Sequence, residues 1–404
     1  MKRSTATIAW MTAAALVATF AATAARAADQ PRMDFYGYVM TDAGYNDKAI
    51  NPDWFDVQRP SRLPSIDNQY GKDGSTFFSS RQTRFGVKSW TPTDMGELKT
   101  TFEFELFGTG VDAGQTTFRL RHAYGELGKW GAGQTWSPFM DIDVFPNTLE
   151  YWGPNGMVFF RNVQLRYMPI QGDTRMTIAL ERPGASGDLG VSSDIVDGSQ
   201  IKARFPLPDL SAEYRMAKPW GYLEAAGMVR QIQWEDLSTG PTDISGSVTG
   251  WGINVSSNLK AGKANVLRLQ VVYGEGLENY MNDAPVDVGT KPNPGDVKKP
   301  VEGVALPVTG IVAFLDHTWS EKMSSSIGYS SCTIDNSEGQ DKDAFKLGQY
   351  ALANLLFTPA PKFMCGVEGG WIHRENNSDG FKVDDYHVQV SAKYSFSFST
   401  GGTQ

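Results

Sequence analysis

Basic residues that alternate with apolar ones are the side chains of this sequence best suited to act on a ligand. They are Arg84, Lys88, Lys99, Arg119, Arg121, Arg166, Arg215, Arg230 and Arg268. Guanidinium and ammonium groups that face one enclosed space create a local positive field, which attracts anions. Each arginine could instead only form an ion pair with a carboxylate such as Glu103 or Glu105. Whether these residues attract anions or only form ion pairs depends on the secondary-structure elements that carry them.

A second group of charged side chains lies in one long connection, Gly133–Gly156 (GQTWSPFMDIDVFPNTLEYWGPNG). At roughly twenty residues it is far longer than an ordinary strand connection, which indicates a functional or a disordered segment. It is too apolar for a solvated tail, while Asp141, Asp143 and Glu150 require water or a basic partner. We therefore predict that residues 137–157 fold into a wide β-barrel as a constriction loop. The alternative is a loop packed on the outside of a soluble β-sandwich.

Residues suited to catalysis or metal binding are scattered. The four histidines are His122, His317, His373 and His387. No G-x-S-x-G motif occurs, and a solvated cluster at a strand end explains Asp384, Asp385 and His387 better than an outer-membrane hydrolase does. The acidic stretch 335–343 could hold calcium, although such stretches are more often only solvated. We predict a protein that is not an enzyme and that carries no cofactor and no metal.

The N-terminal residues resemble an export signal. Two basic residues precede an apolar run over residues 8–24, and the tripeptide ending at Ala27 has the small-x-small pattern of a signal-peptidase site. We expect residues 1–27 to be a signal peptide and the mature chain to start at Ala28; a membrane anchor is the alternative. Without the three basic residues of this segment, 34 of the 37 basic residues remain against 45 acidic ones, a net charge of −11. So acidic a chain argues against a nucleic-acid partner.

Segments of eight to twelve residues that alternate polar and apolar side chains follow one another along the rest of the chain. In ELKTTFEFELF (97–107), Leu98, Phe102 and Phe104 share one face, and Lys99 and Glu103 share the other. This is the length that a tilted strand needs to cross a bilayer. After the N-terminal segment, no apolar run approaches the eighteen or so residues of a transmembrane helix. The number of alternating segments therefore indicates a transmembrane β-barrel.

Short and long connections alternate between these segments, which is typical of outer-membrane barrels with periplasmic turns and extracellular loops. We predict an all-β fold with sixteen antiparallel strands at about 34–45, 78–90, 98–108, 117–127, 129–136, 158–168, 174–182, 209–216, 220–234, 248–258, 264–275, 308–319, 323–333, 346–358, 362–374 and 384–396. Residues 199–205 could add a seventeenth strand, but Pro206 and Pro208 follow, so we place them in the fourth long loop. Charged residues must then point inward, because a charge on the lipid face costs roughly 2–4 kcal/mol near the bilayer midplane.

Several local sequences resemble one known family. They are GQTWSPFMD (133–141), GPNGMVFFRNVQLRY (153–167), GEGLENY (274–280), HTWSEKMSSSIGYS (317–330) and ALANLLFTPAPKFMCGVEGGW (351–371), and they are similar to the DcaP-like family of bacterial outer-membrane trimeric porins. The resemblance spans nearly the whole mature chain, residues 28–404. It implies a homotrimeric barrel, integral to the outer membrane and in contact with its lipid and lipopolysaccharide, that takes up small anionic, often dicarboxylic, solutes. Family members often carry an N-terminal helical extension, which we expect to be absent here.

These observations favour a porin for passive diffusion of small solutes that prefers anions. Its pore-lining selectivity residues would be Arg84, Lys99, Arg119, Arg121, Arg166, Arg215, Arg230 and Arg268, and its constriction-loop acids would be Asp141, Asp143 and Glu150. A porin for sugars or other neutral solutes is the alternative, with Tyr36, Tyr38 and Trp130 as inward aromatic side chains. An outer-membrane enzyme is a third hypothesis.

Overall fold

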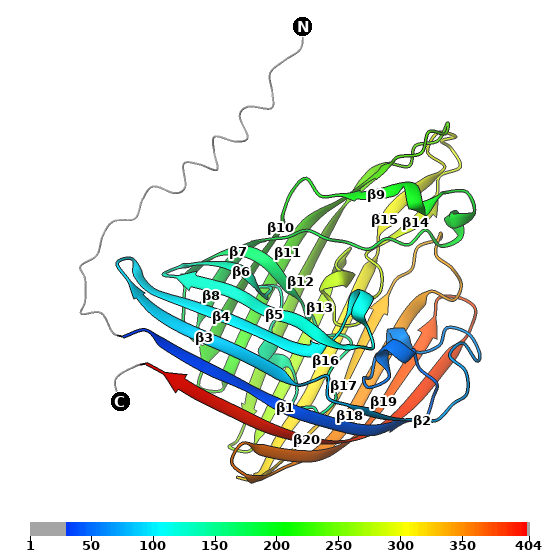
Figure 1. Ribbon diagram of the computed structural model, residues 1–404. Helices are drawn as coiled ribbons and strands as arrows, with labels where there is room; N and C mark the ends of the chain where they lie inside the picture. The colour runs from blue at the N-terminus through cyan, green and yellow to red at the C-terminus, as the bar shows by residue number, and fades with distance from the viewer. Residues whose placement is uncertain (1–29, 402–404) are drawn as a thin grey trace.

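Antiparallel strands form most of residues 30–401, the part of the chain that this computed structural model describes. The signal peptide predicted over residues 1–27 and the mature start predicted at Ala28 lie outside that part. Within it, sixteen strands close into one antiparallel barrel, which confirms the predicted fold class (Figure 1). None of the helices in residues 30–401 is long and apolar enough to cross a membrane.

The strands of the barrel wall follow one another in chain order. They are β1 (Arg32–Asn46), β2 (Ser75–Ser79) together with β3 (Arg84–Thr93), β4 (Gly96–Phe107), β5 (Thr116–Leu127), β6 (Trp130–Trp136), β7 (Arg161–Ile170), β8 (Arg175–Glu181), β10 (Asp209–Lys218), β11 (Gly221–Asp236), β12 (Gly246–Ala261), β13 (Asn265–Glu275), β16 (Pro307–Ser320), β17 (Met323–Ile334), β18 (Phe345–Ala360), β19 (Phe363–Asn376) and β20 (Lys382–Thr400). Further strands are β9 (Ile201–Arg204), β14 (Val288–Pro292) and β15 (Val301–Ala305). Short 3-10 helices in the connections are η1 (Pro52–Trp54), η2 (Pro60–Arg62), η3 (Gly110–Asp112), η4 (Ile142–Val144), η5 (Gly190–Asp194), η6 (Gly198–Gln200) and η7 (Glu278–Tyr280).

The first and last strands close the barrel. β1 pairs antiparallel with β20, from Met33 opposite Thr400 to Asn46 opposite His387, and it also pairs with β2 and β3. The start of β1 and the end of β20 lie side by side at the end of the barrel that carries the short turns, and the long loops gather at the opposite end (Figure 1). In barrels of this kind the short turns are periplasmic and the long loops extracellular.

Alternation of side chains along each strand separates an apolar exterior from a polar interior. On β4, the ring of Phe102 is half exposed, whereas the neighbouring Glu103 and Glu105 are buried inside. On β5, the exposed Phe118 packs edge-on against Phe104 of β4. The exterior is therefore apolar, as contact with lipid tails requires, and the interior collects the ionisable groups.

The structure departs from the predicted strands in three places. The predicted strand 78–90 is interrupted, since β2 ends at Ser79 and β3 begins at Arg84. Residues 201–204, which we placed in a loop, form β9 and pair with residues 233–236 of β11, beyond the part of β11 that pairs with β10. Pro206 and Pro208 interrupt the ladder between β9 and β10, because proline has no backbone N–H to donate. Both strands pair with β11, so β9 extends the position of β10 in the wall and adds no seventeenth strand. Finally, the predicted loop between β13 and β16 contains the hairpin β14–β15.

The topology predicts which connections are accessible from outside the cell. An epitope tag inserted between Asn293 and Pro300, in the largely exposed tip of the β14–β15 hairpin, should bind antibody on intact cells. A tag at Asp94–Met95, in the exposed turn between β3 and β4, should bind antibody only after the outer membrane is permeabilised. Immunofluorescence before and after permeabilisation measures both. Equal labelling of the two sites on intact cells would contradict this orientation.

Candidate functional site

The connection between β6 and β7, residues 137–160, is held inside the barrel by polar contacts with the wall. We call it the crossing segment. It forms hydrogen bonds with Glu181 of β8, Arg215 of β10, Tyr222 of β11, Asn254, Ser256 and Asn258 of β12, Arg268 of β13, Ser330 of β17, Asn354 of β18, Glu368 of β19 and Gln389 of β20. These strands lie around most of the circumference, so the segment crosses the lumen.

Asp141 fixes the first half of the crossing segment. Its side chain is fully buried and accepts hydrogen bonds from Arg215 Nη2 (2.5 Å), Tyr222 Oη (2.6 Å) and Ser256 Oγ (2.7 Å). Asp143 also contacts Arg215, but 49% of its side chain is exposed. Of these two predicted acids, Asp141 is an anchor and Asp143 remains accessible to water.

Glu150 and Glu368 fix the second half of the segment. Glu368 of β19 accepts the backbone N–H groups of Leu149 and Glu150, each at 2.8 Å. Glu150 in turn accepts the backbone N–H groups of Gln58 (3.0 Å), in the loop after β1, and of Trp152 (2.7 Å). Burial raises the pKa of Glu150 to about 8, against the effect of these donors. The third predicted acid therefore joins two loops to each other.

Two further extracellular loops fold inward, which sequence reasoning missed. Arg59, in the loop after β1, pairs through Nε with Asp283, in the loop after β13, at 2.9 Å. Trp152 of the crossing segment donates from Nε1 to the backbone oxygen of Asn282, also in the loop after β13, at 2.8 Å. The loop after β1 buries the apolar residues Trp54, Val57 and Leu63. Apolar residues of this kind in a long loop were the sequence signal that could have indicated this arrangement.

The first group of wall arginines surrounds two carboxylates of β4, Glu103 and Glu105. Its members are Arg84, Arg119, Arg121 and Arg161. Arg121 is almost fully buried and donates to Glu103 from Nε (2.6 Å) and to Glu105 from Nη1 (2.7 Å). Arg119 lies 3.7 Å from Glu105 and keeps 26% of its side chain exposed. Four guanidinium groups against two carboxylates make this side of the lumen positive. Arg161 was missed because a two-residue period counted from Arg166 places it on the outer face of the predicted strand 158–168, whereas β7 begins only at Arg161.

A second group of charges, on β8, β10, β11 and the crossing segment, is rich in carboxylates. Arg215 and Arg175 contact the four acids Asp141, Asp143, Glu213 and Glu224. Three of these acids are buried, and Asp143 is the accessible one. Arg215, predicted as a selectivity residue, is therefore enclosed by carboxylates, and Arg175 was not predicted.

Arg230, another predicted selectivity residue, is buried and holds two extracellular loops. It donates to the backbone oxygens of Gly184 and Gly276 and to the side chain of Asn279. Its Nε lies 3.3 Å from Asp209 of β10. These contacts give Arg230 a structural position at the junction of wall and loops.

The remaining predicted basic residues lie elsewhere on the inner wall. Arg268 pairs with Asp316 at 2.6 Å, with about a fifth of its side chain exposed. Arg166 donates from Nε to Gln164 Oε1 at 3.0 Å. Arg166 and Lys99 line the same cavity, so the structure brings these two together.

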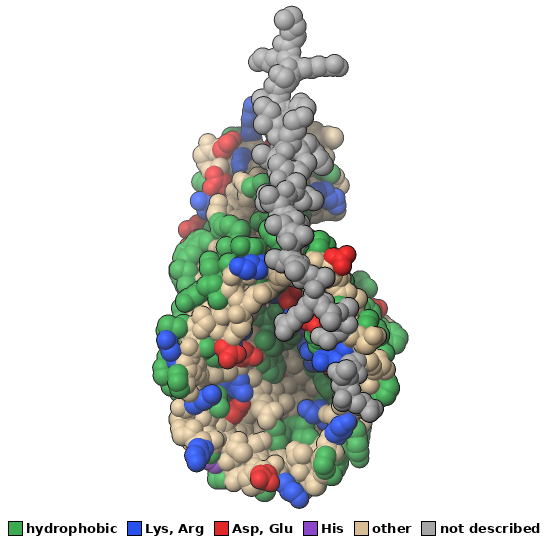
Figure 2. Space-filling view, turned by 90° about the vertical axis from the view of Figure 1, so that its left-hand side faces the viewer, with side chains coloured by type: hydrophobic (Ala, Val, Ile, Leu, Met, Phe, Trp, Pro, Cys, Tyr) green, Lys and Arg blue, Asp and Glu red, His purple; other side chains and the backbone are tan. Residues whose placement is uncertain are grey.

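Two cavities lie on either side of the crossing segment. The outer cavity has a volume of about 250 Å³, and its charged lining residues are Arg59, Arg119 and Glu278. The inner cavity has a volume of about 430 Å³, and its charged lining residues are Lys99, Arg166, Arg175, Glu126 and Glu213. Seen from the end that carries the short turns, the barrel is hollowed, with charged side chains of both signs around the hollow (Figure 2). Cationic side chains outnumber anionic ones in both cavities.

One family model matches almost the whole sequence. The DcaP outer membrane protein family covers residues 15–396. The chain belongs to this family. The predicted resemblance and the outer-membrane location are thereby confirmed. No curated protein sequence matches the chain significantly.

Solved structures share the fold of this DcaP family member. The outer membrane channel DcaP of Acinetobacter baumannii has a TM-score of 0.73 and 21% identity, over 93% of this chain and 100% of that one. The trimer form of OmpT from Vibrio cholerae has a TM-score of 0.53 and 14% identity, over 91% and 99%. An anion-selective porin from Comamonas acidovorans has a TM-score of 0.56 and 10% identity, over 91% and 100%. At these identities the likeness establishes the porin fold.

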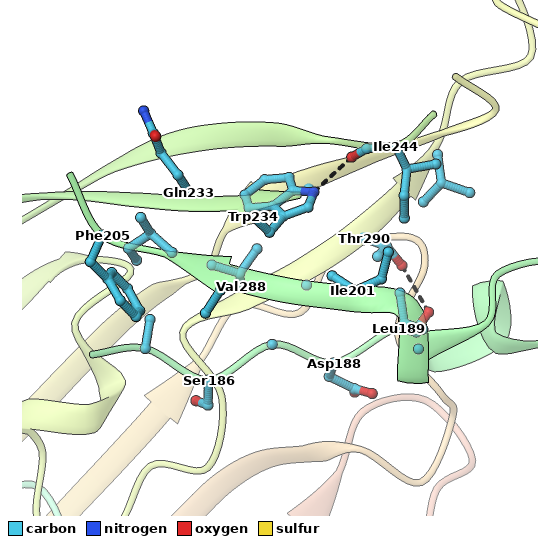
Figure 3. Close-up of a pocket in the computed structure, with 18 residues that line it drawn as sticks. Ser186, Asp188, Leu189, Ile201, Phe205, Gln233, Trp234, Ile244, Val288 and Thr290 are labelled. Atoms are coloured by element: carbon cyan, nitrogen blue, oxygen red, sulfur yellow. Dashed lines mark hydrogen bonds between the residues drawn. The ribbon is translucent and has the colours of Figure 1, made fainter. Parts of the chain in front are cut away.

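A third cavity, of about 410 Å³, lies among the extracellular loops of this DcaP family member (Figure 3). Its lining includes Ile201, Phe205, Trp234 and Val288. The indole Nε1 of Trp234 donates to the backbone oxygen of Ile244 at 2.7 Å, and Asp188 accepts from Gln340 Nε2 at 2.9 Å. A largely apolar space in which Trp234 and Asp188 already have partners is unsuited to a charged solute.

The aromatic residues considered for sugar binding are dispersed. Tyr36 donates to Glu103 at 2.8 Å, and the guanidinium of Arg84 lies 5.3 Å over the ring of Tyr38. Trp130 packs on Tyr167. The next residue of β6, Gly131, faces the inward side chains of Tyr124 and Arg166. Successive residues of a strand face opposite sides of the wall. Trp130 therefore faces outward, and the prediction that it points inward is wrong.

The residues considered for hydrolysis bind other partners. His387 Nδ1 pairs with Asn46 Oδ1 at 2.6 Å, Asp384 contacts His373 Nδ1 at 2.9 Å, and Asp385 accepts a backbone N–H. In residues 30–401, which include the acidic stretch 335–343, no group of three or more His, Cys, Asp or Glu side chains is arranged to hold a metal ion.

Proposed function

We propose that this protein is a porin through which small organic anions diffuse passively across the outer membrane. The observation that carries the proposal is the charge of the two lumen cavities: two arginines and one glutamate line the outer cavity, and three basic and two acidic residues line the inner one. A lining with an excess of cations attracts anions even in an acidic chain. The Comamonas acidovorans porin of similar fold, described as anion-selective, shows that such a barrel can have this selectivity.

In this proposal the crossing segment is the constriction, because it contributes to both cavities. Tyr151 and Trp152 belong to the outer cavity, and Ser137 and Met140 belong to the inner one. A solute would pass the segment beside the positive group of arginines on β3–β7, of which Arg119 is an accessible member.

The assembly we propose is a homotrimer surrounded by outer-membrane lipid and lipopolysaccharide. The apolar exterior supports contact with lipid, because the exposed side chains Phe102, Phe118 and Val255 all lie on barrel strands. The OmpT structure of similar fold, described as a trimer form, supports the number of subunits.

Replacing Arg119 by alanine should lower the preference for anions while the barrel stays folded. Its guanidinium borders the outer cavity and is only loosely paired, at 3.7 Å from Glu105. At an effective dielectric near 20 and a separation of about 6 Å, one charge attracts an anion by about 3 kcal/mol before screening. Because salt screens much of this, we expect the anion-to-cation permeability ratio to fall roughly two- to fivefold. Reversal potentials across planar bilayers in a potassium chloride gradient measure this ratio.

Arg204→Ala is the matched control for this experiment. It removes the same charge from β9, where the side chain is 60% exposed and pairs with Glu235, so the permeability ratio should not change. A wild-type channel without anion preference would contradict the proposal and favour neutral solutes. An Arg119→Ala channel with wild-type selectivity would show that Arg119 only pairs with Glu105.

A further inference from the structure

Strand β9 has a hydrogen-bonded neighbour on one side and a free edge on the other. Within the part of the chain that the structure describes, it pairs only with β11. The N–H of Leu237 donates to the oxygen of Gln200 at 3.1 Å, so in this antiparallel ladder Lys202 and Arg204 exchange the next hydrogen bonds with β11. The N–H and C=O groups of Ala203, which lies between them, therefore point away from β11. Among the described residues these two groups have no hydrogen-bond partner.

The chain that leaves β8 turns away from this edge. In the wall β8 pairs with β10, and β9 extends the position of β10, so residues that continued β8 in line would cover the free edge. The backbone oxygen of Gly184 instead accepts a hydrogen bond from the buried Arg230, and the N–H of Ser186 donates to the buried Asp287 at 2.7 Å. The segment after β8 is thereby held inside the loops, and Ala203 stays exposed.

The third cavity, of about 410 Å³, adjoins the free edge. Ile201 and Ala203, alternate residues of β9, line one side of it, and residues 186–189 line another (Figure 3). Trp234 of β11 and Val288 of β14 add apolar surface. A strand added to the edge of β9 would direct every second side chain to the same face as Ile201 and Ala203, and so into the cavity. The lining is largely apolar, so apolar side chains suit these positions.

The opposite face of β9 carries two basic side chains. Lys202 is exposed, and Arg204 is 60% exposed although it pairs at 3.2 Å with Glu235 of β11. Two cations against one carboxylate leave an excess of positive charge on this face of the ladder. On an added strand, the residues opposite Lys202 and Arg204 lie on the same face. Acidic residues there form favourable cross-strand pairs, whereas basic residues are repelled.

We propose that the free edge of β9 is a docking site at the cell surface for an extended peptide segment of another protein, in which acidic and apolar residues alternate. The peptide backbone pairs with Ala203, its apolar side chains enter the third cavity, and its acidic side chains face Lys202 and Arg204. The β9 strand of a second copy of this chain is a poor occupant, because it would place basic residues opposite Lys202 and Arg204. This interaction is separate from the passage of solutes through the lumen.

Three short fluorescent peptides test the proposal on the intact protein in detergent micelles, with fluorescence anisotropy as the measurement. The first alternates glutamate and valine, the second alternates lysine and valine, and the third repeats the first with N-methylated valines, which lack the N–H donors of the backbone. We expect saturable binding of the first peptide, binding roughly tenfold weaker of the second, and no binding of the third. Failure of the first peptide to bind, equal binding of the first two, or equal binding of the first and third would overturn the proposal.

Two variants of β9 separate the role of the edge from that of the charge. Ala203→Pro removes the N–H that faces the free edge and none that bonds to β11, so β9 should persist while the glutamate–valine peptide no longer binds. Lys202→Glu combined with Arg204→Glu should reverse the preference, so that the lysine–valine peptide binds more tightly. Lys260→Glu combined with Lys263→Glu makes the same change of charge at exposed positions between β12 and β13, at the short-turn end, and should keep the wild-type preference. Wild-type binding by Ala203→Pro would exclude the edge as the docking site.

Single-channel conductance and the size of the assembly complete the experiment. Neither Ala203→Pro nor the charge reversal on β9 changes a residue of the crossing segment, so both variants should conduct like wild type, which shows that the barrel is folded. Light scattering of the purified protein in detergent measures the assembly and should give the same mass for Ala203→Pro and wild type. A smaller mass for Ala203→Pro would show that the edge of β9 holds a second copy of this chain, and the proposal would then be wrong.

Discussion

Replacing Asp141 by alanine should loosen the crossing segment from the barrel wall and raise the single-channel conductance. The substitution removes the acceptor of Arg215, Tyr222 and Ser256, all of which bond to the fully buried Asp141. Arg215 keeps Asp143 and Glu224 as partners, but the buried hydroxyl groups of Tyr222 and Ser256 lose their acceptor, which costs roughly 1–3 kcal/mol for each unsatisfied group. Since this cost falls on the segment that crosses the lumen, we expect larger and noisier current steps in planar bilayers.

Asp143→Ala provides the matched control two residues away. Its carboxylate contacts the same Arg215 but is half exposed, so its loss should change stability by less than about 1 kcal/mol and leave the current steps close to wild type. The barrel itself should form in both variants, because the strand ladders do not involve either side chain. Equal conductance of the Asp141→Ala and wild-type channels would show that the other contacts suffice to hold the segment.

Replacing Arg230 by alanine should produce the largest loss of stability among the predicted selectivity residues. The guanidinium is buried between Asp209 and Asp287 and also bonds to Gly184 and Gly276 in two different loops. Without it, two buried carboxyl groups lose their cation, and we expect a decrease of roughly 3–5 kcal/mol in the free energy of unfolding. Urea titration of the purified protein in detergent measures this decrease.

Limited proteolysis locates the effect of Arg230→Ala. Cleavage should increase within residues 182–208 and 276–306, the two loops that Arg230 joins, and not in the short turns. Arg204→Ala, which removes an exposed charge near the same loops, should leave both the unfolding curve and the cleavage pattern unchanged. A stable Arg230→Ala protein with altered chloride preference would instead place Arg230 on the solute path.

Local periodicity was sufficient to predict the wall of the barrel. Phe102, Phe104 and Phe118 alternate with charged residues, and a two-residue period determines the face on which each side chain lies. Ion pairs between adjacent strands follow from the same register, as Arg84 with Glu105 directly opposite illustrates. This part of the lumen was therefore accessible to sequence reasoning.

Contacts between loops were not predictable in the same way. Arg59 and Asp283 lie in loops separated by most of the barrel, and no periodicity relates their positions. The lining of the outer cavity depends on these long-range contacts, so it could be identified only in the structure.

The seam between β1 and β20 limits the order in which this protein can be made. It pairs the two ends of the described chain, from Met33 with Thr400 to Asn46 with His387, and so closes the longest loop in the molecule. A barrel lacking β20 would expose two unpaired strand edges, which a hydrocarbon environment does not tolerate. Closure must therefore wait until β20 has been synthesised, and the entropy of joining such distant segments makes it a slow step. A chain truncated before β20 should accumulate in the periplasm as a substrate for proteases, never as a smaller channel.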